Sequence, residues 1–163
     1  MSAKTRHFVV AAVLSFLLDG AQSFGLLDVN LADIQPDFYS GSAHKWPCGA
    51  RECGVLYVNK TAQAKLWPSV YSAYPGAVGF SKTFESFGQR DEATMIAMHE
   101  ALSFQTKVGR AAVEKRARDL TTQLTAGLAK IPGITNWTSP VAERRVAVVS
   151  FVPGTLDANK LAT

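Results

Sequence analysis

Residues 19–45 read DGAQSFGLLDVNLADIQPDFYSGSAHK and place an acid, an amide, a hydroxyl, an imidazole and a lysine in a fixed order. Asp19 directly follows the apolar run Phe16-Leu17-Leu18, where a buried parallel strand would end. The carboxyl ends of such strands are where open α/β sheets bind their ligands. The stretch therefore predicts an α/β fold with a ligand site near Asp19.

The residue types in this stretch suit one cofactor, pyridoxal phosphate. A lysine amine can form a Schiff base with an aldehyde and later exchange it for a substrate amine. A carboxylate that faces the pyridine nitrogen keeps it protonated, so the ring can accept electrons from a substrate carbanion. Lys45 and Asp19 are the candidates for these roles. A plainer interpretation stays open, because Asp-Gly is common in turns and a single lysine is usually solvated.

Five motifs follow one another along the chain in an order that is more specific than any one of them. In this order the sequence resembles the class V aminotransferases, a branch of the fold-type I pyridoxal phosphate enzymes that includes cysteine desulfurases and isopenicillin N epimerase-like proteins. The motifs are DGAQ (19–22), SAHK (42–45), GVLYV (54–58), FESFGQRDEATMIAMHEAL (84–102) and GRAAVEKRARDL (109–120).

This resemblance implies a role for each site residue. Lys45 would carry the Schiff base and, once freed by substrate, move the proton. Asp19 would pair with the pyridinium nitrogen, and Gln22 would hydrogen-bond the phenolic oxygen of the ring. Ser42 and His44 would contact the cofactor phosphate, for which hydroxyl and imidazole donors are effective partners.

The resemblance also implies a fold, a substrate class and a subunit arrangement. Residues 1–108 would form part of the mixed-sheet, cofactor-binding large domain, and residues 109–163 would begin the α+β small C-terminal domain. The substrate would be a small amino acid, undergoing epimerase, lyase or transaminase chemistry. The enzyme would be a cytoplasmic homodimer, in which Gln89 could donate its amide to the phosphate of the partner subunit's cofactor.

Parts of the family's active site are not found in these 163 residues. The phosphate-binding turn before a helix and the arginine that holds the substrate carboxylate fall outside the chain. No crossover separates Ser15 from Phe16, where the family has a helix between two parallel strands. An alternative prediction is therefore a catalytically incompetent fragment of such an enzyme.

A third alternative is a small secreted protein. Lys4 and Arg6 precede an apolar run at 8–18, and Ala21-Gln22-Ser23 offers a cleavage pattern of a secretory signal. Cleavage there would discard Asp19, which argues against the signal. The apolar run is also shorter than the roughly 20 residues that a membrane-spanning helix needs, so we expect no membrane association.

Composition and charge indicate which classes of function are not expected. The chain is 47% hydrophobic and 18% charged, as in ordinary globular proteins, and its net charge is only +4. Its main basic cluster, at 107–118, alternates with apolar residues at helical spacing, including Val113, Leu120 and Leu124. These charges are most simply the solvated face of an amphipathic helix, so no nucleic-acid binding is expected.

The two cysteines do not predict a metal or redox site. Cys48 and Cys53 cannot complete a four-ligand zinc site without distant partners. Cytosolic enzymes rarely keep structural disulfides. We expect both thiols to serve in packing.

Hydrophobic periodicity and the positions of capping residues, glycine and proline predict the remaining helices and strands. Strands are expected at 7–18, 38–40, 54–58, 134–138 and 146–152, and an irregular loop at 70–80. A helix capped by Asp91 should run to about residue 107, and a second should follow Gly109 and end near residue 130. A further helix is expected to start within 155–162.

Overall fold

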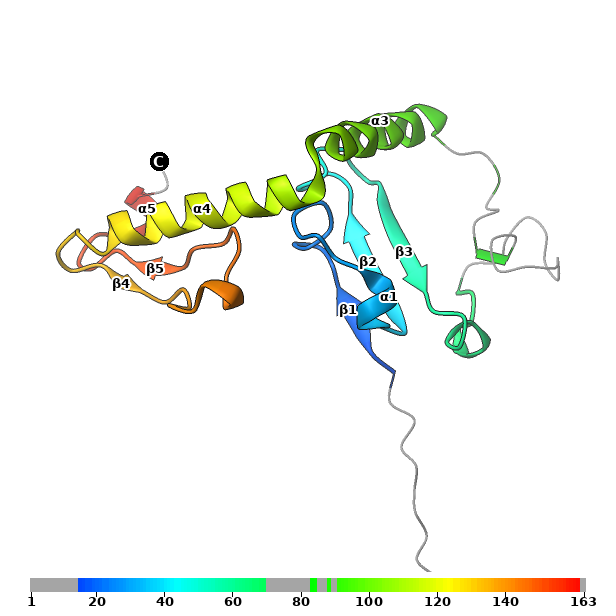
Figure 1. Ribbon diagram of the computed structural model, residues 1–163, viewed down its shortest axis with the longest axis horizontal. Coiled ribbons are helices and arrows are strands. Elements are labelled where there is room, and N and C mark those ends of the chain that lie inside the picture. Colours follow the sequence, from blue (N-terminus) through cyan, green and yellow to red (C-terminus); the bar gives the residue numbers. More distant parts are fainter. Residues whose placement is uncertain (1–14, 70–82, 85–87, 89–90, 162–163) are drawn as a thin grey trace, which may run out of the picture.

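The computed structural model of the protein describes residues 15–69, 83–84, 88 and 91–161 (Figure 1). It contains a mixed three-stranded sheet, two long consecutive helices and a two-stranded sheet beside the second helix. This mixture agrees with the predicted α/β class. The larger sheet holds β1 (Leu17–Asp19), β2 (Phe38–Ser42) and β3 (Gly54–Val58), and the helices are α3 (Glu92–Val108) and α4 (Arg110–Leu128).

Strand pairing decides which side chains share a face of this sheet. β1 pairs with β2 in parallel, and β2 pairs with β3 antiparallel. Tyr39 lies opposite Leu18 and Tyr57, whereas Asp19 lies opposite Ser40. Because successive side chains in a strand point to opposite faces, Tyr39 and Asp19 belong to different faces. Tyr39 is only 3% exposed, so its face is the more covered of the two.

The connection between β1 and β2 is a true crossover. It runs through residues 20–37, longer than the roughly dozen residues that parallel neighbours need, and it contains α1 (Leu31–Ile34). The side chain of Asn30 caps α1 by accepting a hydrogen bond from the backbone N–H of Ala32 at 3.0 Å. The strand predicted at 7–18 is confirmed only at its end, and residues 7–14 lie outside the described residues.

The two long helices begin and are separated at the predicted capping and breaking residues. The carboxylate of Asp91 accepts a hydrogen bond from the backbone N–H of Thr94 at 3.2 Å and so caps α3. Gly109 separates α3 from α4 with φ 89°, a left-handed conformation that favours glycine. The chain changes direction at this point, and α4 extends away from the three-stranded sheet (Figure 1).

The C-terminal segment lies along α4. It contains β4 (Thr135–Asn136), η2 (Ala142–Arg144), β5 (Phe151–Val152) and α5 (Ala158–Leu161). Arg118 on α4 donates hydrogen bonds to the backbone carbonyls of Ala142 and Arg145, at 3.0 and 2.7 Å. The two predicted strands of this segment exist but are shorter than expected, with two residues each.

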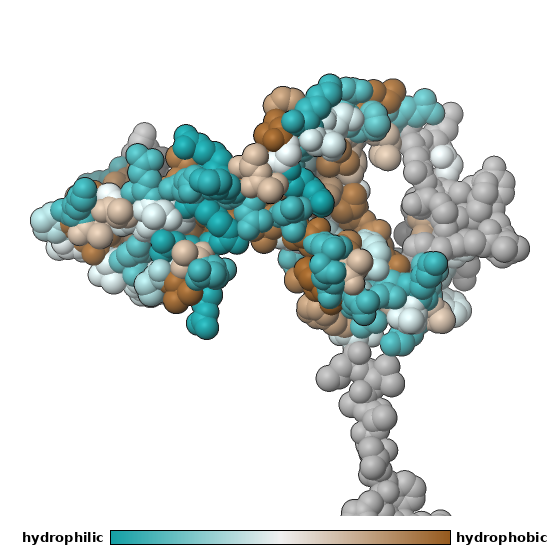
Figure 2. Space-filling view, in the orientation of Figure 1, coloured by the Kyte–Doolittle hydropathy of each residue, from teal (hydrophilic) through white to brown (hydrophobic). Residues whose placement is uncertain are grey.

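Few side chains are buried in the described part of the chain. The most buried apolar residues include Leu26, Tyr39 and Val58 around the larger sheet, and Leu128 at the end of α4. Leu120 and Leu124, predicted to lie on the inner face of α4, are 45% and 50% exposed. Figure 2 shows hydrophobic side chains at the surface of both halves of the molecule. Among the described residues, no helix is long and apolar enough to cross a membrane.

Candidate active site

Asp19 ends β1 at the carboxyl edge of the parallel strand pair, as predicted. The prediction that this strand is buried is wrong, because Phe16 and Leu17 are 50% and 61% exposed. Its Oδ1 accepts a hydrogen bond from the backbone N–H of Ala21 at 2.9 Å, which starts the turn that follows. Asp19 lies opposite Ser40, and Ser42 is two residues further along β2 on the same face. With strands about 4.8 Å apart and about 3.3 Å per residue, the Cα atoms of Asp19 and Ser42 are roughly 8 Å apart.

Gly20 lets the chain turn closely over the sheet at this edge. Its N–H donates to the carbonyl of Ser40 at 2.6 Å. A Cβ atom at this position would lie 2.2 Å from the ring of Tyr39 and 2.5 Å from the Ser40 carbonyl oxygen. No side chain fits there, so the Asp-Gly pair is a structural requirement of the turn that carries Asp19 and Gln22.

The lysine turn, residues 43–49, is held by its backbone. The N–H of Ala43 donates to the carbonyl of Cys53 at 2.8 Å, and the N–H of Gly49 donates to the carbonyl of Ala43 at 2.7 Å. Ala43 is fully buried, and Pro47 is among the most deeply buried residues of the described chain. These contacts fix the turn while the side chains of His44 and Lys45 remain exposed.

The side chains of Ser42, His44 and Lys45 are available to a ligand. Within the described residues, none of the three makes a side-chain hydrogen bond or ion pair. Ser42 is half-buried at the end of β2, where it pairs with Gly54. A hydroxyl, an imidazole and an amine with no internal partner are donors that can be used for binding an anion and an aldehyde.

A side-chain hydrogen bond joins the two halves of the site. The indole Nε1–H of Trp46 donates to Oε1 of Gln22 at 2.9 Å. The bond connects the turn after β1 with the lysine turn, although the two residues are 24 positions apart. Sequence reasoning did not single out Trp46, and the only signal available was its position next to Lys45.

A groove extends from Asp19 and Gln22 toward the C-terminal segment. It has a volume of about 390 Å³ and is also lined by Ser139, Arg144 and Ser150. Lys45 does not line this groove, so the predicted residues divide between the groove and the exposed lysine turn. Gln89, predicted to contact a partner's cofactor, lies outside the described residues.

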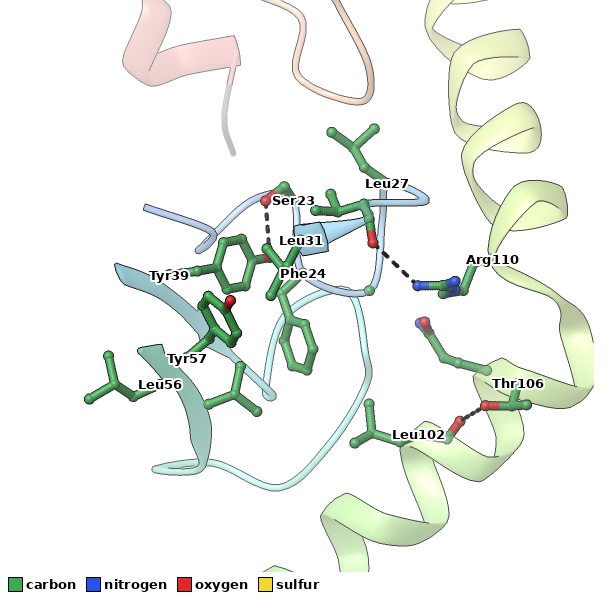
Figure 3. Close-up of a pocket in the computed structure, with 14 residues that line it drawn as sticks. Ser23, Phe24, Leu27, Leu31, Tyr39, Leu56, Tyr57, Leu102, Thr106 and Arg110 are labelled. Carbon is green, nitrogen blue, oxygen red and sulfur yellow. Dashed lines mark hydrogen bonds between the residues drawn. The ribbon is translucent and has the colours of Figure 1, made fainter. Parts of the chain in front are cut away.

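A second pocket lies on the opposite face of the sheet and includes none of the predicted site residues. Its volume is about 390 Å³, and Figure 3 shows Phe24, Tyr39 and Tyr57 around it, with Leu102 from α3. Arg110, at its edge, donates to the carbonyl of Val29 at 3.4 Å. This pocket is mainly apolar and lacks the donor set that the sequence predicts.

The cysteines do not form a metal site within the described part of the chain, where no group of three or more metal-binding side chains occurs. The Cys53 Sγ lies 2.9 Å from the Met98 Sδ and is part-buried, as a packing role predicts. The same prediction is wrong for Cys48, whose thiol is exposed. Cys48 has φ 60°, a left-handed conformation within the lysine turn.

The donor set fits the predicted cofactor. A carboxylate and an amide lie at one edge of the sheet, and an amine, an imidazole and a hydroxyl lie on the adjoining turn and strand end. Pyridoxal phosphate presents a pyridine nitrogen, a phenolic oxygen, an aldehyde and a phosphate, which these groups match by charge and hydrogen-bonding type. The aldehyde needs a lysine with a free amine, and among the described residues the amine of Lys45 has no partner.

Comparisons with known proteins show which family this chain resembles. The family model described as "Aminotransferase class-V" matches residues 6–163. Isopenicillin N epimerase of Streptomyces clavuligerus is 33% identical over 159 residues, which cover 87% of this chain and 40% of the relative. A probable cysteine desulfurase of Pyrococcus abyssi is 29% identical over 149 residues, which cover 83% of this chain and 36% of the relative.

Solved structures share the fold. Cysteine desulfurase from Thermococcus onnurineus matches with a TM-score of 0.79 and 23% identity, over 91% of this chain and 39% of that one. A C-DES mutant, with glycine covalently linked to its PLP cofactor, matches with a TM-score of 0.71 and 22% identity. The match covers 87% of this chain and 39% of that one. The chain thus spans 36% to 40% of the length of these four proteins.

Proposed function

Because this chain belongs to the aminotransferase class-V family, we propose that it carries the lysine half of a pyridoxal phosphate site that acts on a small amino acid. The family and the fold class predicted from the sequence are confirmed. The cofactor is supported by the donor set and by the PLP-linked neighbour. Residues 1–108 are proposed as the cofactor-binding part, and residues 109–163 as the beginning of the small domain.

One observation carries this proposal: the hydrogen bond from Trp46 to Gln22 joins the segment of Asp19 to the turn of Lys45. The acid and the lysine come from different strands, so without such a contact they would share only a sequence pattern. Here the sheet register and this bond bring their segments to one edge. An acid, an amide and an unpaired lysine at the carboxyl edge of a parallel strand pair are what this cofactor requires.

The bound cofactor would supply an electron sink for the carbanion formed at the substrate Cα. Lys45 is proposed to hold it covalently and, with its amine free, to carry the proton at Cα. Asp19 would keep the ring nitrogen protonated, and Gln22 would donate to the phenolic oxygen. Ser42 and His44 would bind the phosphate.

Substrate and assembly are also proposals. The substrate is a small amino acid, and the reaction is an epimerisation, an elimination or a transamination at Cα or Cβ. Isopenicillin N epimerase and the desulfurases among the relatives support this range. The chain is proposed to act in a homodimer, in which Gln89 reaches the partner's cofactor. We also propose the cytoplasm as its location.

A non-catalytic form is the second candidate. It would keep the cofactor-binding residues without turning over a substrate. One observation favours it: the side chains of Lys45 and His44 are exposed. An open site lets water reach the reacting atoms, whereas closure normally protects this chemistry.

The first experiment is a visible spectrum of the purified chain with pyridoxal phosphate, followed by borohydride reduction and peptide mapping. We expect the label on Lys45, and we expect Lys45→Ala to lose it. Lys60→Ala, which removes another exposed lysine, should keep it. A label scattered over surface lysines would contradict the proposed site. Exchange of the Cα proton of added amino acids with deuterium, followed by NMR, then separates the catalytic from the non-catalytic form.

A further inference from the structure

We propose that Trp46 is a positioning residue that orients the amide of Gln22 toward the cofactor. The proposal rests on the function proposed above. It starts from the 2.9 Å hydrogen bond between the indole Nε1–H of Trp46 and Oε1 of Gln22.

The chemistry of the two groups makes this bond directional. An indole nitrogen is a donor only, whereas a glutamine amide has one acceptor end and one donor end. Trp46 can therefore bind only the oxygen of Gln22, which leaves the NH₂ group of Gln22 for another partner. The phenolic oxygen of pyridoxal phosphate is an acceptor and needs a donor. If the amide turned over, its oxygen would face that acceptor and repel it.

Trp46 is itself held in place from the other side. The side-chain Nε2–H of Gln105, on α3, donates to the backbone carbonyl of Trp46 at 2.6 Å. Gln105 is only 9% exposed, and Pro47, the next residue after Trp46, is among the most deeply buried. A chain of contacts thus runs from α3 through Trp46 to Gln22. Such a supported donor can define the orientation of the amide.

The other two tryptophans provide an internal comparison. Trp67 and Trp137 are 80% and 74% exposed, whereas Trp46 is half-buried. Trp46 lines a groove together with Leu26 and with Val113, which lies on α4. Within the described residues, Trp46 is the tryptophan whose indole N–H has a side-chain acceptor. The indole N–H of Trp46 can therefore be compared directly with the indole N–H groups of the other two tryptophans.

The first test uses the cofactor-free chain. In a ¹H–¹⁵N NMR spectrum, we expect the indole N–H of Trp46 to exchange with solvent more slowly than those of Trp67 and Trp137. Gln22→Leu should remove this protection and leave the other two indole signals unchanged. An indole of Trp46 that exchanges as fast as the exposed pair would overturn the inference, whether or not the cofactor binds.

The second test measures the dissociation constant and the absorption maximum of bound pyridoxal phosphate in a double-mutant cycle. Trp46→Phe should weaken binding about fivefold, the worth of one ordinary hydrogen bond, and shift the absorption band. Trp67→Phe is the matched control and should change neither. If Trp46 acts through Gln22, then Trp46→Phe has no further effect in the Gln22→Leu background.

Three results separate the inference from the function on which it rests. Additive effects of the two substitutions, or an unchanged dissociation constant in a folded Trp46→Phe variant, would overturn the role of Trp46 alone. A wild-type chain in which Lys45 is not labelled would overturn the proposed function, and the inference with it. In that case the protected indole of Trp46 would record a structural contact only.

Discussion

Asp19 and Ser42 lie on the same face of the three-stranded sheet, because Asp19 pairs with Ser40 in the parallel ladder and Ser42 follows two residues later. The opposite face carries Tyr39 and Tyr57, which line the apolar pocket. A shift of one residue in the pairing of β1 with β2 would move Asp19 to that apolar side. The register therefore decides whether the acid and the hydroxyl can meet one ligand.

Asp19→Asn should weaken pyridoxal phosphate binding while the fold stays intact. The asparagine oxygen can still accept from the N–H of Ala21, but it carries no charge for a pyridinium nitrogen. Losing a charged hydrogen bond of about 1.5 to 3 kcal/mol should raise the dissociation constant at least tenfold. Absorbance titration measures this. Asp157→Asn is the control, since Asp157 accepts in the same way from the N–H of Asn159 and lies away from the site.

Gly20→Ala should destabilise the protein by about 1 to 3 kcal/mol, because the added methyl group overlaps the ring of Tyr39 and the carbonyl of Ser40. Urea unfolding gives the free energy. Gly127→Ala on α4 is the matched change, with nothing within 4 Å of the new Cβ, and should stabilise by about 0.5 to 1 kcal/mol. Equal effects of the two substitutions would show that Gly20 is not confined by the sheet.

Glu114 should make stability depend on pH. Hydrogen bonds from the N–H of Asp28 and from Arg118 lower the pKa of Glu114 below its ordinary value of 4.5. The carboxylate therefore stabilises the folded state above pH 4.5, and this contribution is lost as the pH falls through the lowered pKa of the folded state. Glu114→Gln should cost about 1 kcal/mol at pH 7 and close to nothing well below pH 4.5.

Urea unfolding at the two pH values measures this difference for Glu114→Gln. Glu100→Gln is the control, because Glu100 is exposed on α3 and makes no hydrogen bond among the described residues. A cost for Glu114→Gln that stays the same at both pH values would show that the charge of Glu114 has no part in it.

Arg118→Met should loosen the C-terminal segment. Arg118 donates to two backbone carbonyls of that segment, Ala142 and Arg145, and pairs with Glu114 at 2.8 Å. Removing the guanidinium leaves these acceptors without their donor, at about 1 to 3 kcal/mol. Amide hydrogen exchange should speed up over residues 142–150. In Arg116→Met, which removes an exposed arginine of the same helix, exchange there should stay as in the wild type.

The sequence alone was enough to predict the helices and strands whose ends are marked by capping or turn residues. β3 has the predicted bounds, and α3 begins after its Asp91 cap, because these signals act within a few residues. The strand predicted at 146–152 is shorter in the structure, since a strand extends only as far as another strand pairs with it. Leu120 and Leu124 were placed inside by periodicity, but a pattern does not say what covers a helix face.

The sequence by itself determined the family, the order of the site residues and the donor types that suit the cofactor, because these depend on residue identity and spacing. Only the tertiary structure decided which of these groups meet. The pairing of β1 with β2 puts Asp19 and Ser42 on one face, and the contact between Trp46 and Gln22 joins residues 24 positions apart. Such contacts depend on strand register and side-chain direction, and both are settled only when the distant segments pack together.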